Sequence, residues 1–258
     1  MTDRRILGLS AASLAAKGAA AALLVVFLIF YLKPVAALLI TRWDVRNEKE
    51  LWVVPRPLPT LPAVSSIKGK TFSYFGYQID SPWADVKQEK ALKFMTVLYF
   101  SGGQLIAIHD PAQMPDDVQI MEQADGEHGA RIKNIFGEDT MRSNYALRSR
   151  ILNLTPGDLR LSFSWREMAS NSTLLMLKPM WSLQSKDGLY SFETNFLRGF
   201  QEGDPARDNM VVIDAFDAQD REIELWIGSQ RGTAVRPSQA DIDGIVWSVR
   251  PAATLQTK

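Results

Sequence analysis

Residues 18–40 form one run of apolar, small and aromatic side chains that only Lys33 and Pro34 interrupt. Because an α-helix rises 1.5 Å per residue, these 23 residues cover about 34 Å, more than the roughly 30 Å of a bilayer core. A lysine near the end of a span can extend its ammonium group to the lipid headgroups. The sequence therefore predicts one transmembrane helix over residues 18–40, preceded by a short tail over residues 1–17.

Two other interpretations of this run remain open. The span could end at Leu32, which would leave residues 35–40 at the membrane interface. Residues 35–37, Val-Ala-Ala, also resemble the small-residue site at which a secretory signal peptide is cleaved. The chain stays apolar past that site, as far as Ile40, and this continuation favours a retained anchor.

The orientation of the helix and its partners follow from the same region. Basic residues lie on both sides of the run, so the positive-inside rule does not separate the two topologies. A short tail ahead of a single span commonly stays inside, so we expect the C-terminal domain outside the cytoplasm. The lipid bilayer is the expected partner of residues 18–40. Gly18 and Ala22 form a small-xxx-small pair, through which a second copy could approach as a homodimer.

The composition describes a folded domain after this run. Hydrophobic residues make up 46% of the chain and charged residues 22%, which is too apolar for disorder. The first 50 residues carry 7 basic and 4 acidic side chains, which leaves 22 and 25 for the remainder and a formal charge of −3. A mildly acidic domain is a poor nucleic-acid binder, because phosphates require clustered cations. The absence of cysteine excludes disulfides, thiolate nucleophiles and cysteine-ligated zinc.

A proline-rich linker over residues 41–66 is expected between the membrane and the domain. Prolines at short spacing favour extended polyproline II, which predicts a stiff stalk. The prolines are Pro55, Pro57, Pro59 and Pro62. The globular domain is expected over residues 67–251, and a C-terminal tail over residues 252–258.

The first half of the domain is predicted to form strands. Phe75, Tyr77 and Ile79 alternate with other residue types, as in a strand with one buried face. Residues 95–100 and 104–109 are apolar runs rich in β-formers, separated by Ser-Gly-Gly. Glycine supplies the positive φ that a tight turn requires, so these two runs predict a hairpin.

The middle of the domain is predicted to be helical. Residues 155–158 match a helix start, with a threonine cap and a proline at the first helical position. Residues 159–165 then alternate as a strand would, but we favour a helix because the cap has a specific mechanism. Another short helix is predicted over residues 172–181, where Pro179 must end or kink it. An earlier helical face is formed by Leu147, Ile151 and Leu154.

The last third combines strands with a closing helix. Residues 189–200 are rich in aromatic side chains and contain Gly199, a predicted bulge. Residues 210–216 and 222–227 are the arms of a predicted hairpin, with strict alternation in the second arm. A capping box at residues 238–241 then precedes helically spaced apolar residues. These are Ile242, Ile245, Val246 and Val249.

Together these elements predict an α+β fold with a mainly antiparallel sheet and packed helices. Their order resembles the PsbP-like fold, through Tyr77–Pro82, the hairpin Met210–Ile227 and the closing helix at Asp241–Val246. The resemblance covers residues 71–250. It implies a domain that binds other proteins or helps to assemble them, and it transfers no catalytic residue.

The candidates for metal or acid–base chemistry are the two histidines, His109 and His128. The sequence has no HExxH motif and no Gly-x-Ser-x-Gly elbow. A shared site would require the fold to bring the two rings together, and we favour local roles at a strand end and in a loop. We therefore predict no catalytic residue, no metal and no cofactor.

Two groups of charged residues have structural interpretations that we favour over functional ones. Carboxylates around the late hairpin could hold calcium, but aspartates more often serve turns. They are Asp204, Asp208, Asp214, Asp217 and Asp220. A basic group is interpreted as the solvated face of a helix rather than a surface for acidic lipid or an acidic partner. It comprises Arg131, Lys133, Arg142, Arg148 and Arg150.

These features favour a membrane-tethered, non-enzymatic module that binds a protein or an envelope component. Such a surface is expected to use exposed aromatic side chains. The candidate binding residues are Trp83, Trp165, Trp181 and Trp226. The alternative is an envelope hydrolase with its site near His109 and His128, completed by a carboxylate or a serine.

Overall fold

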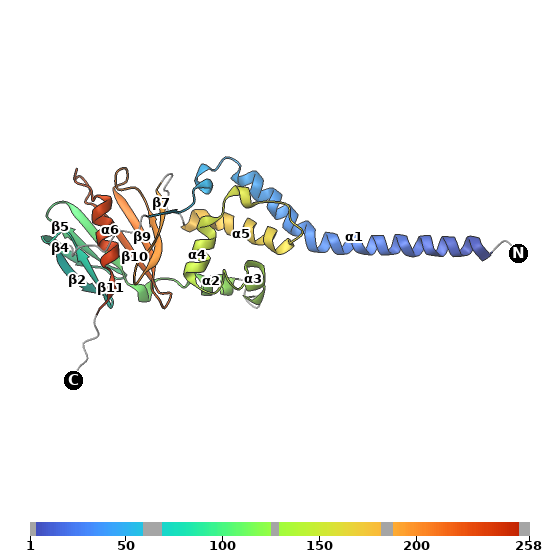
Figure 1. Ribbon diagram of the computed structural model, residues 1–258, viewed down its shortest axis with the longest axis horizontal. Helices are drawn as coiled ribbons and strands as arrows, with labels where there is room; N and C mark the ends of the chain where they lie inside the picture. The colour runs from blue at the N-terminus through green and yellow to red at the C-terminus, as the bar shows by residue number, and fades with distance from the viewer. Residues whose placement is uncertain (1–3, 59–68, 125–128, 182–187, 253–258) are drawn as a thin grey trace, which may run out of the picture.

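The computed structural model describes residues 4–58, 69–124, 129–181 and 188–252. Figure 1 shows three parts in a row: a long protruding helix, a group of shorter helices, and a β-structure at the far end. The predicted α+β class is confirmed, and so is the mainly antiparallel sheet.

Helix α1, Arg4–Val45, continues without interruption through Lys33 and Pro34. Within it, residues 15–45 are apolar and long enough to cross a membrane, and no other helix in the described ranges meets both conditions. Figure 1 shows that α1 bends where it reaches the helical group, and a proline inside a helix is a usual cause of such a bend.

The two halves of α1 have different surroundings. The side chains of residues 23–30 are exposed. Leu38, Thr41 and Val45 are buried, because this half of α1 packs along α5, Trp165–Trp181. The predicted span of residues 18–40 therefore begins as an exposed rod and ends with one side packed against α5.

The segment predicted as a free stalk is held against the domain as far as Leu58. It forms the short helix η1, Lys49–Trp52, and the strand β1, Arg56–Pro57. The ammonium group of Lys178, buried in α5, donates hydrogen bonds to the carbonyl oxygens of Leu51, Val53 and Leu154 at 3.2, 2.7 and 2.5 Å. The stalk prediction is wrong for residues 49–58, because a buried cation needs these carbonyls as partners.

The larger sheet has eight strands in the order β1-β7-β8-β9-β10-β6-β5-β4. Neighbouring strands are antiparallel except β1 and β7, which are parallel. The predicted hairpins β5–β6 and β9–β10 are confirmed. The remaining strands are β4 Val86–Ala91, β5 Met95–Phe100, β6 Gln104–His109, β7 Leu189–Glu193, β8 Arg198–Glu202, β9 Met210–Phe216 and β10 Glu222–Ser229.

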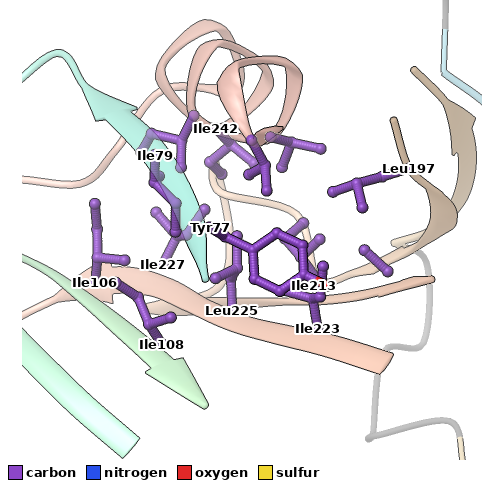
Figure 2. Packing of buried hydrophobic residues seen from close by; sticks show 14 of the residues in the cluster. Tyr77, Ile79, Ile106, Ile108, Leu197, Ile213, Ile223, Leu225, Ile227 and Ile242 are labelled. Carbon is purple, nitrogen blue, oxygen red and sulfur yellow. The ribbon is translucent and has the colours of Figure 1, made fainter. Parts of the chain in front are cut away.

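A smaller sheet and the closing helix cover one face of the larger sheet. The smaller sheet has the order β11-β3-β2, with β2 Lys70–Tyr74, β3 Tyr77–Ser81 and β11 Arg250–Pro251. Helix α6, Gln239–Ser248, begins at the predicted capping box of Ser238 and Asp241. Figure 2 shows Ile79 of β3 and Ile242 of α6 above Leu225 of β10, in the main hydrophobic core.

A second core lies among the helices, on the side of the sheet toward the rod (Figure 1). Its members come from α1, α5 and the central helices, and they include Leu38, Leu147 and Leu174. The predicted helix around Leu147 is confirmed as α4. The shorter elements of this region are η2 Pro111–Gln113, α2 Asp117–Ala124, α3 Gly129–Phe136, α4 Asn144–Asn153 and η4 Pro156–Asp158.

Two local predictions are corrected by the structure. Phe75 lies in the turn between β2 and β3, where Phe75 and Gly76 have φ angles of 51° and 84°, and not in a strand. The capping signal at Thr155 yields only the single turn η4, and residues 159–164 then form neither helix nor strand. The predicted helix over residues 172–181 is the second half of α5, which begins at Trp165 and contains Pro179 in its last turn.

The predicted bulge at Gly199 is also wrong. Gly199 pairs in unbroken register with Phe192 of β7 and Ala215 of β9. A Cβ atom at this position would lie 2.1 Å from the carbonyl oxygen of Asp214. Glycine is needed here because the backbone of β9 approaches too closely for any side chain.

We expect Gly199→Ala to lower the free energy of unfolding by roughly 2 kcal/mol or more, because the neighbouring backbone must shift. Thermal unfolding of the full-length protein in detergent, followed by circular dichroism, measures the change. Gly102→Ala is the matched control, since its Cβ would meet only the flexible side chain of Gln104. Equal melting temperatures for the two variants would contradict this account.

Candidate functional site

The most unusual group of side chains lies on the face of β9 and β10 that is turned away from the main core. Side chains alternate along a strand, so Ile223, Leu225 and Ile227 enter the core while Glu222, Glu224 and Trp226 take the opposite face. Helices α2 and α4 cover part of this opposite face, and Glu222 is therefore buried.

Arg148 of α4 is the centre of the group. Its guanidinium donates to Asp117 of α2 at 2.9 Å, to Asp214 of β9 at 3.1 Å and to Glu222 of β10 at 3.2 Å. The arginine is only 6% exposed, and its three partners are buried with it. The prediction that Arg148 belongs to a solvated basic face is wrong. A buried cation requires polar or charged partners, and the carboxyl groups that contact Arg148 come from α2, β9 and β10.

His109 and Trp226 lie at the edge of the same group. The two rings are 5.1 Å apart between centroids. The Nε2 atom of His109 is 3.5 Å from a carboxylate oxygen of Glu224, which also accepts a hydrogen bond from the indole N–H of Trp226. His109 is thus placed beside a carboxylate, as acid–base chemistry would require, but in a half-buried position.

The group contains more negative than positive charge. Four carboxylates, those of Asp117, Asp214, Glu222 and Glu224, lie around one guanidinium. Burial raises the pKa of Glu222 to about 8 and that of Asp214 to about 6, in both cases against the opposing effect of Arg148. Glu222 therefore holds a proton at neutral pH, because ionising it would add to an uncompensated buried charge.

Burial and nearby charges also shift the pKa values of the remaining groups. Burial raises the pKa of Glu224, although its hydrogen bond from Trp226 acts in the other direction. Burial also lowers the pKa of His109, against the attraction of Asp214, so the imidazole is neutral at pH 7. For Arg148, burial opposes the charge, but the surrounding carboxylates outweigh it and raise the pKa.

Three of these carboxylates could approach a single cation. Oxygen atoms of Asp214, Glu222 and Glu224 all lie within 4.8 Å of one another. Carboxylate oxygens suit magnesium or calcium. The guanidinium of Arg148 already occupies oxygen atoms of Asp214 and Glu222, however, so we interpret the group as an internal polar network that joins α2 and α4 to the sheet.

The aspartates of the late hairpin have separate tasks. Asp217 accepts a hydrogen bond from the Tyr77 hydroxyl at 2.6 Å and pairs with Arg221 at 2.7 Å. Asp220 accepts from the backbone N–H groups of Asn144 and Tyr145, and so caps the beginning of α4. The interpretation as turn carboxylates holds for these two residues. It is wrong for Asp214, which belongs to the Arg148 network.

The predicted binding tryptophans are not gathered at one place. Trp83 packs edge-on against Phe100 at 5.3 Å beside the main core. Trp165 packs on the helical core, and the ring of Trp226 contacts that of His109 at a tilted angle. Each of these three is partly buried. The side chain of Trp181 and the whole of His128 lie outside the described residues, so a shared site with His109 stays a prediction.

Sequence reasoning missed the Arg148 network for a definite reason. The alternation of residues 222–227 located the two faces of β10, but the partners of Arg148 are 31, 66 and 74 positions away along the chain.

No protein-family model, curated protein or solved structure matches this chain.

The raised pKa of Glu222 predicts a pH-dependent stability. In the unfolded chain this carboxyl titrates near 4.5, but in the folded state near 8, so the folded state holds an extra proton between these values. The free energy of unfolding should therefore fall as the pH rises from 5 to 8. Glu222→Gln should make this decline shallower, as measured by melting temperature against pH.

Glu193→Gln, at an exposed position on β7, serves as the control and should leave the decline unchanged. Identical pH profiles for the Glu222→Gln variant and the parent protein would show that Glu222 is not the group that carries the proton.

Proposed function

We propose that this protein is a single-pass membrane protein whose C-terminal domain lies outside the cytoplasm and binds a protein or another envelope component. In this proposal the domain is not an enzyme, and it acts where the anchor holds it. The observation that carries the proposal is helix α1, whose bare half is apolar while its other half is part of the domain core.

The exposure of the bare half supports a membrane location. The side chains of residues 23–30 are between 43% and 70% exposed, and they include Leu23, Phe27 and Ile29. A continuous apolar surface of this kind is unfavourable in water, and a bilayer removes it from water at no cost to the fold.

The packing of the other half supports a retained helix over a cleaved signal peptide. Cleavage after Ala37 would remove Tyr31 and Val35, which pack against the helical core, and would leave Leu38 at a new chain end. It would also remove the hydrogen bond from the Tyr31 hydroxyl to the carbonyl oxygen of Phe163. The folded domain is therefore built to include α1.

A binding or assembly role is supported by two features. We propose, from the order of its elements, that the domain is PsbP-like. Proteins of that fold mostly bind or help to assemble other proteins. The most polar buried group, around Arg148, is tied up in internal ion pairs. Partly exposed tryptophans such as Trp83 and Trp226 are the proposed contact residues, and Gly18 with Ala22 is the proposed contact between two copies.

A second candidate is an envelope hydrolase that uses His109. The position of its neutral imidazole beside Glu224 favours this alternative, since the pair could move a proton. Hydrolysis of a model ester by the purified protein, lost in His109→Ala, would support it. An activity unchanged by that substitution would exclude it.

We expect the full-length protein, expressed in a bacterial host, to stay in the membrane pellet after an alkaline carbonate wash. Leu23→Arg combined with Val26→Arg should move it to the soluble or aggregated fraction, because an arginine well inside a span costs about 3 kcal/mol. The matched control, Leu23→Ala with Val26→Ala, should remain in the pellet.

External protease should digest the C-terminal domain in spheroplasts of the same cells while leaving the N-terminal tail intact. A mature chain that begins after Ala37, or complete release by the alkaline wash, would overturn the proposed anchoring.

A further inference from the structure

The segment that leads into α5 exposes two large apolar side chains next to α1. Leu161 is 66% exposed and Phe163 is 95% exposed. The hydroxyl group of Tyr31 donates a hydrogen bond of 2.7 Å to the carbonyl oxygen of Phe163, which holds the segment against the helix. In Figure 1 the chain at the beginning of α5 lies beside α1 where the bare part of that helix begins.

A groove of about 290 Å³ runs between this segment and α1. Its lining is almost entirely apolar, and Ser162 and Tyr31 are the lining residues that carry hydroxyl groups. The other lining residues are Phe27, Tyr31, Val35, Leu161, Phe163 and Met168. Three of them, Phe27, Tyr31 and Val35, belong to the stretch of α1 that is apolar and long enough to cross a membrane.

We propose that Leu161 and Phe163, the exposed apolar side chains of residues 159–164, dip into the outer leaflet beside α1, and that the groove holds an acyl chain of a bilayer lipid. This inference rests on the proposed function, in which α1 spans the membrane. The groove shares a wall with α1, so a bilayer around that helix also reaches the groove. Lipid chains then cover Leu161 and Phe163, which no described part of the protein covers.

Charged residues around the segment set its depth. Lys33, Arg160 and Arg166 are all exposed, and the guanidinium of Arg166 lies 5.5 Å from the ring centre of Trp165. Arginine and tryptophan are typical of the membrane interface, and cations there attract lipid phosphates. Only the apolar tips of the segment enter the leaflet, and the membrane surface lies near Tyr31.

The length of α1 agrees with this depth. Twenty residues counted back from Tyr31 reach Ala12 and cover about 30 Å of helix, the thickness of a bilayer core. Lys17 would then lie about five residues inside the opposite surface, close enough for its ammonium to reach the headgroups. The span thus lies nearer to the N-terminus than the apolar run alone predicts.

Part of the backbone of the segment is satisfied by internal hydrogen bonds, which favours a position close to lipid. Tyr31 pairs with the carbonyl oxygen of Phe163, and the backbone N–H of Ser164 donates to the Ser162 hydroxyl oxygen at 3.1 Å. The backbone N–H of Arg160 donates to the carbonyl oxygen of Asp158 at 2.9 Å. These bonds lower the cost of taking the segment out of water.

The natural absence of cysteine allows a direct test by single-cysteine labelling of the full-length protein. Phe163→Cys, Leu24→Cys and Leu92→Cys, all at exposed positions, would each carry an environment-sensitive fluorophore. The proteins would be reconstituted into phosphatidylcholine vesicles in which a fraction of the lipid bears a nitroxide on its acyl chain. Leu24 reports on the span, and Leu92, in the turn between β4 and β5, should stay in water.

We expect acyl-chain nitroxides to quench the labels at residues 163 and 24 several-fold more than the label at residue 92. The emission of the label at residue 163 should also shift to the blue in vesicles. Quenching at residue 24 without quenching at residue 163 would overturn this inference and leave the proposed anchoring intact. Absence of quenching at both positions would overturn the anchoring itself.

A second measurement tests the depth. A label at Ile40→Cys lies about 13 Å beyond Tyr31 along the helix, so it should be quenched little by acyl-chain nitroxides. Quenching at residue 40 equal to that at residue 24 would mean that the whole helical group is immersed, and would overturn the proposed membrane level.

Discussion

The packing of the second half of α1 along α5 is the contact on which the rest of the arrangement depends. It buries Leu38 and Val45 in the helical core, so the apolar rod and the folded domain are one structure rather than two parts joined by a linker. Lys178 reinforces this contact by binding the carbonyl oxygens that follow the rod. The direction of α1 therefore determines how the domain faces whatever surface the rod enters.

The Arg148 network performs the corresponding task between the helices and the sheet. Its carboxylates come from α2, β9 and β10, so they meet only when these elements are in their final places. Buried ion pairs seldom add net stability, but a mismatched alternative would leave a charge unpaired at high cost. The surplus of carboxylates over cations adds a pH dependence, because burial raises the pKa of Glu222 to about 8.

The correct and incorrect predictions differ in the range of the interactions involved. The β5–β6 and β9–β10 hairpins and the beginning of α6 depend on neighbours within a few residues, and these elements were predicted correctly. The prediction of a free stalk was wrong because it could not include Lys178, which lies more than 120 positions along the chain from the carbonyl groups that it binds. The prediction of a helix after Thr155 was wrong because the single turn η4 already satisfies the capping residues. Residues 159–164 are then held by the hydrogen bond from Tyr31 to the carbonyl oxygen of Phe163.

The sequence by itself determined the apolar rod, the alternation of the strands and the absence of thiol chemistry, since these follow from composition and local periodicity. Only the tertiary structure decided that half of the rod belongs to the core, that Arg148 is buried and that Leu161 and Phe163 stand beside α1. The physical reason is that hydrophobic burial and charge pairing act between residues that are close in space, whatever their distance along the chain.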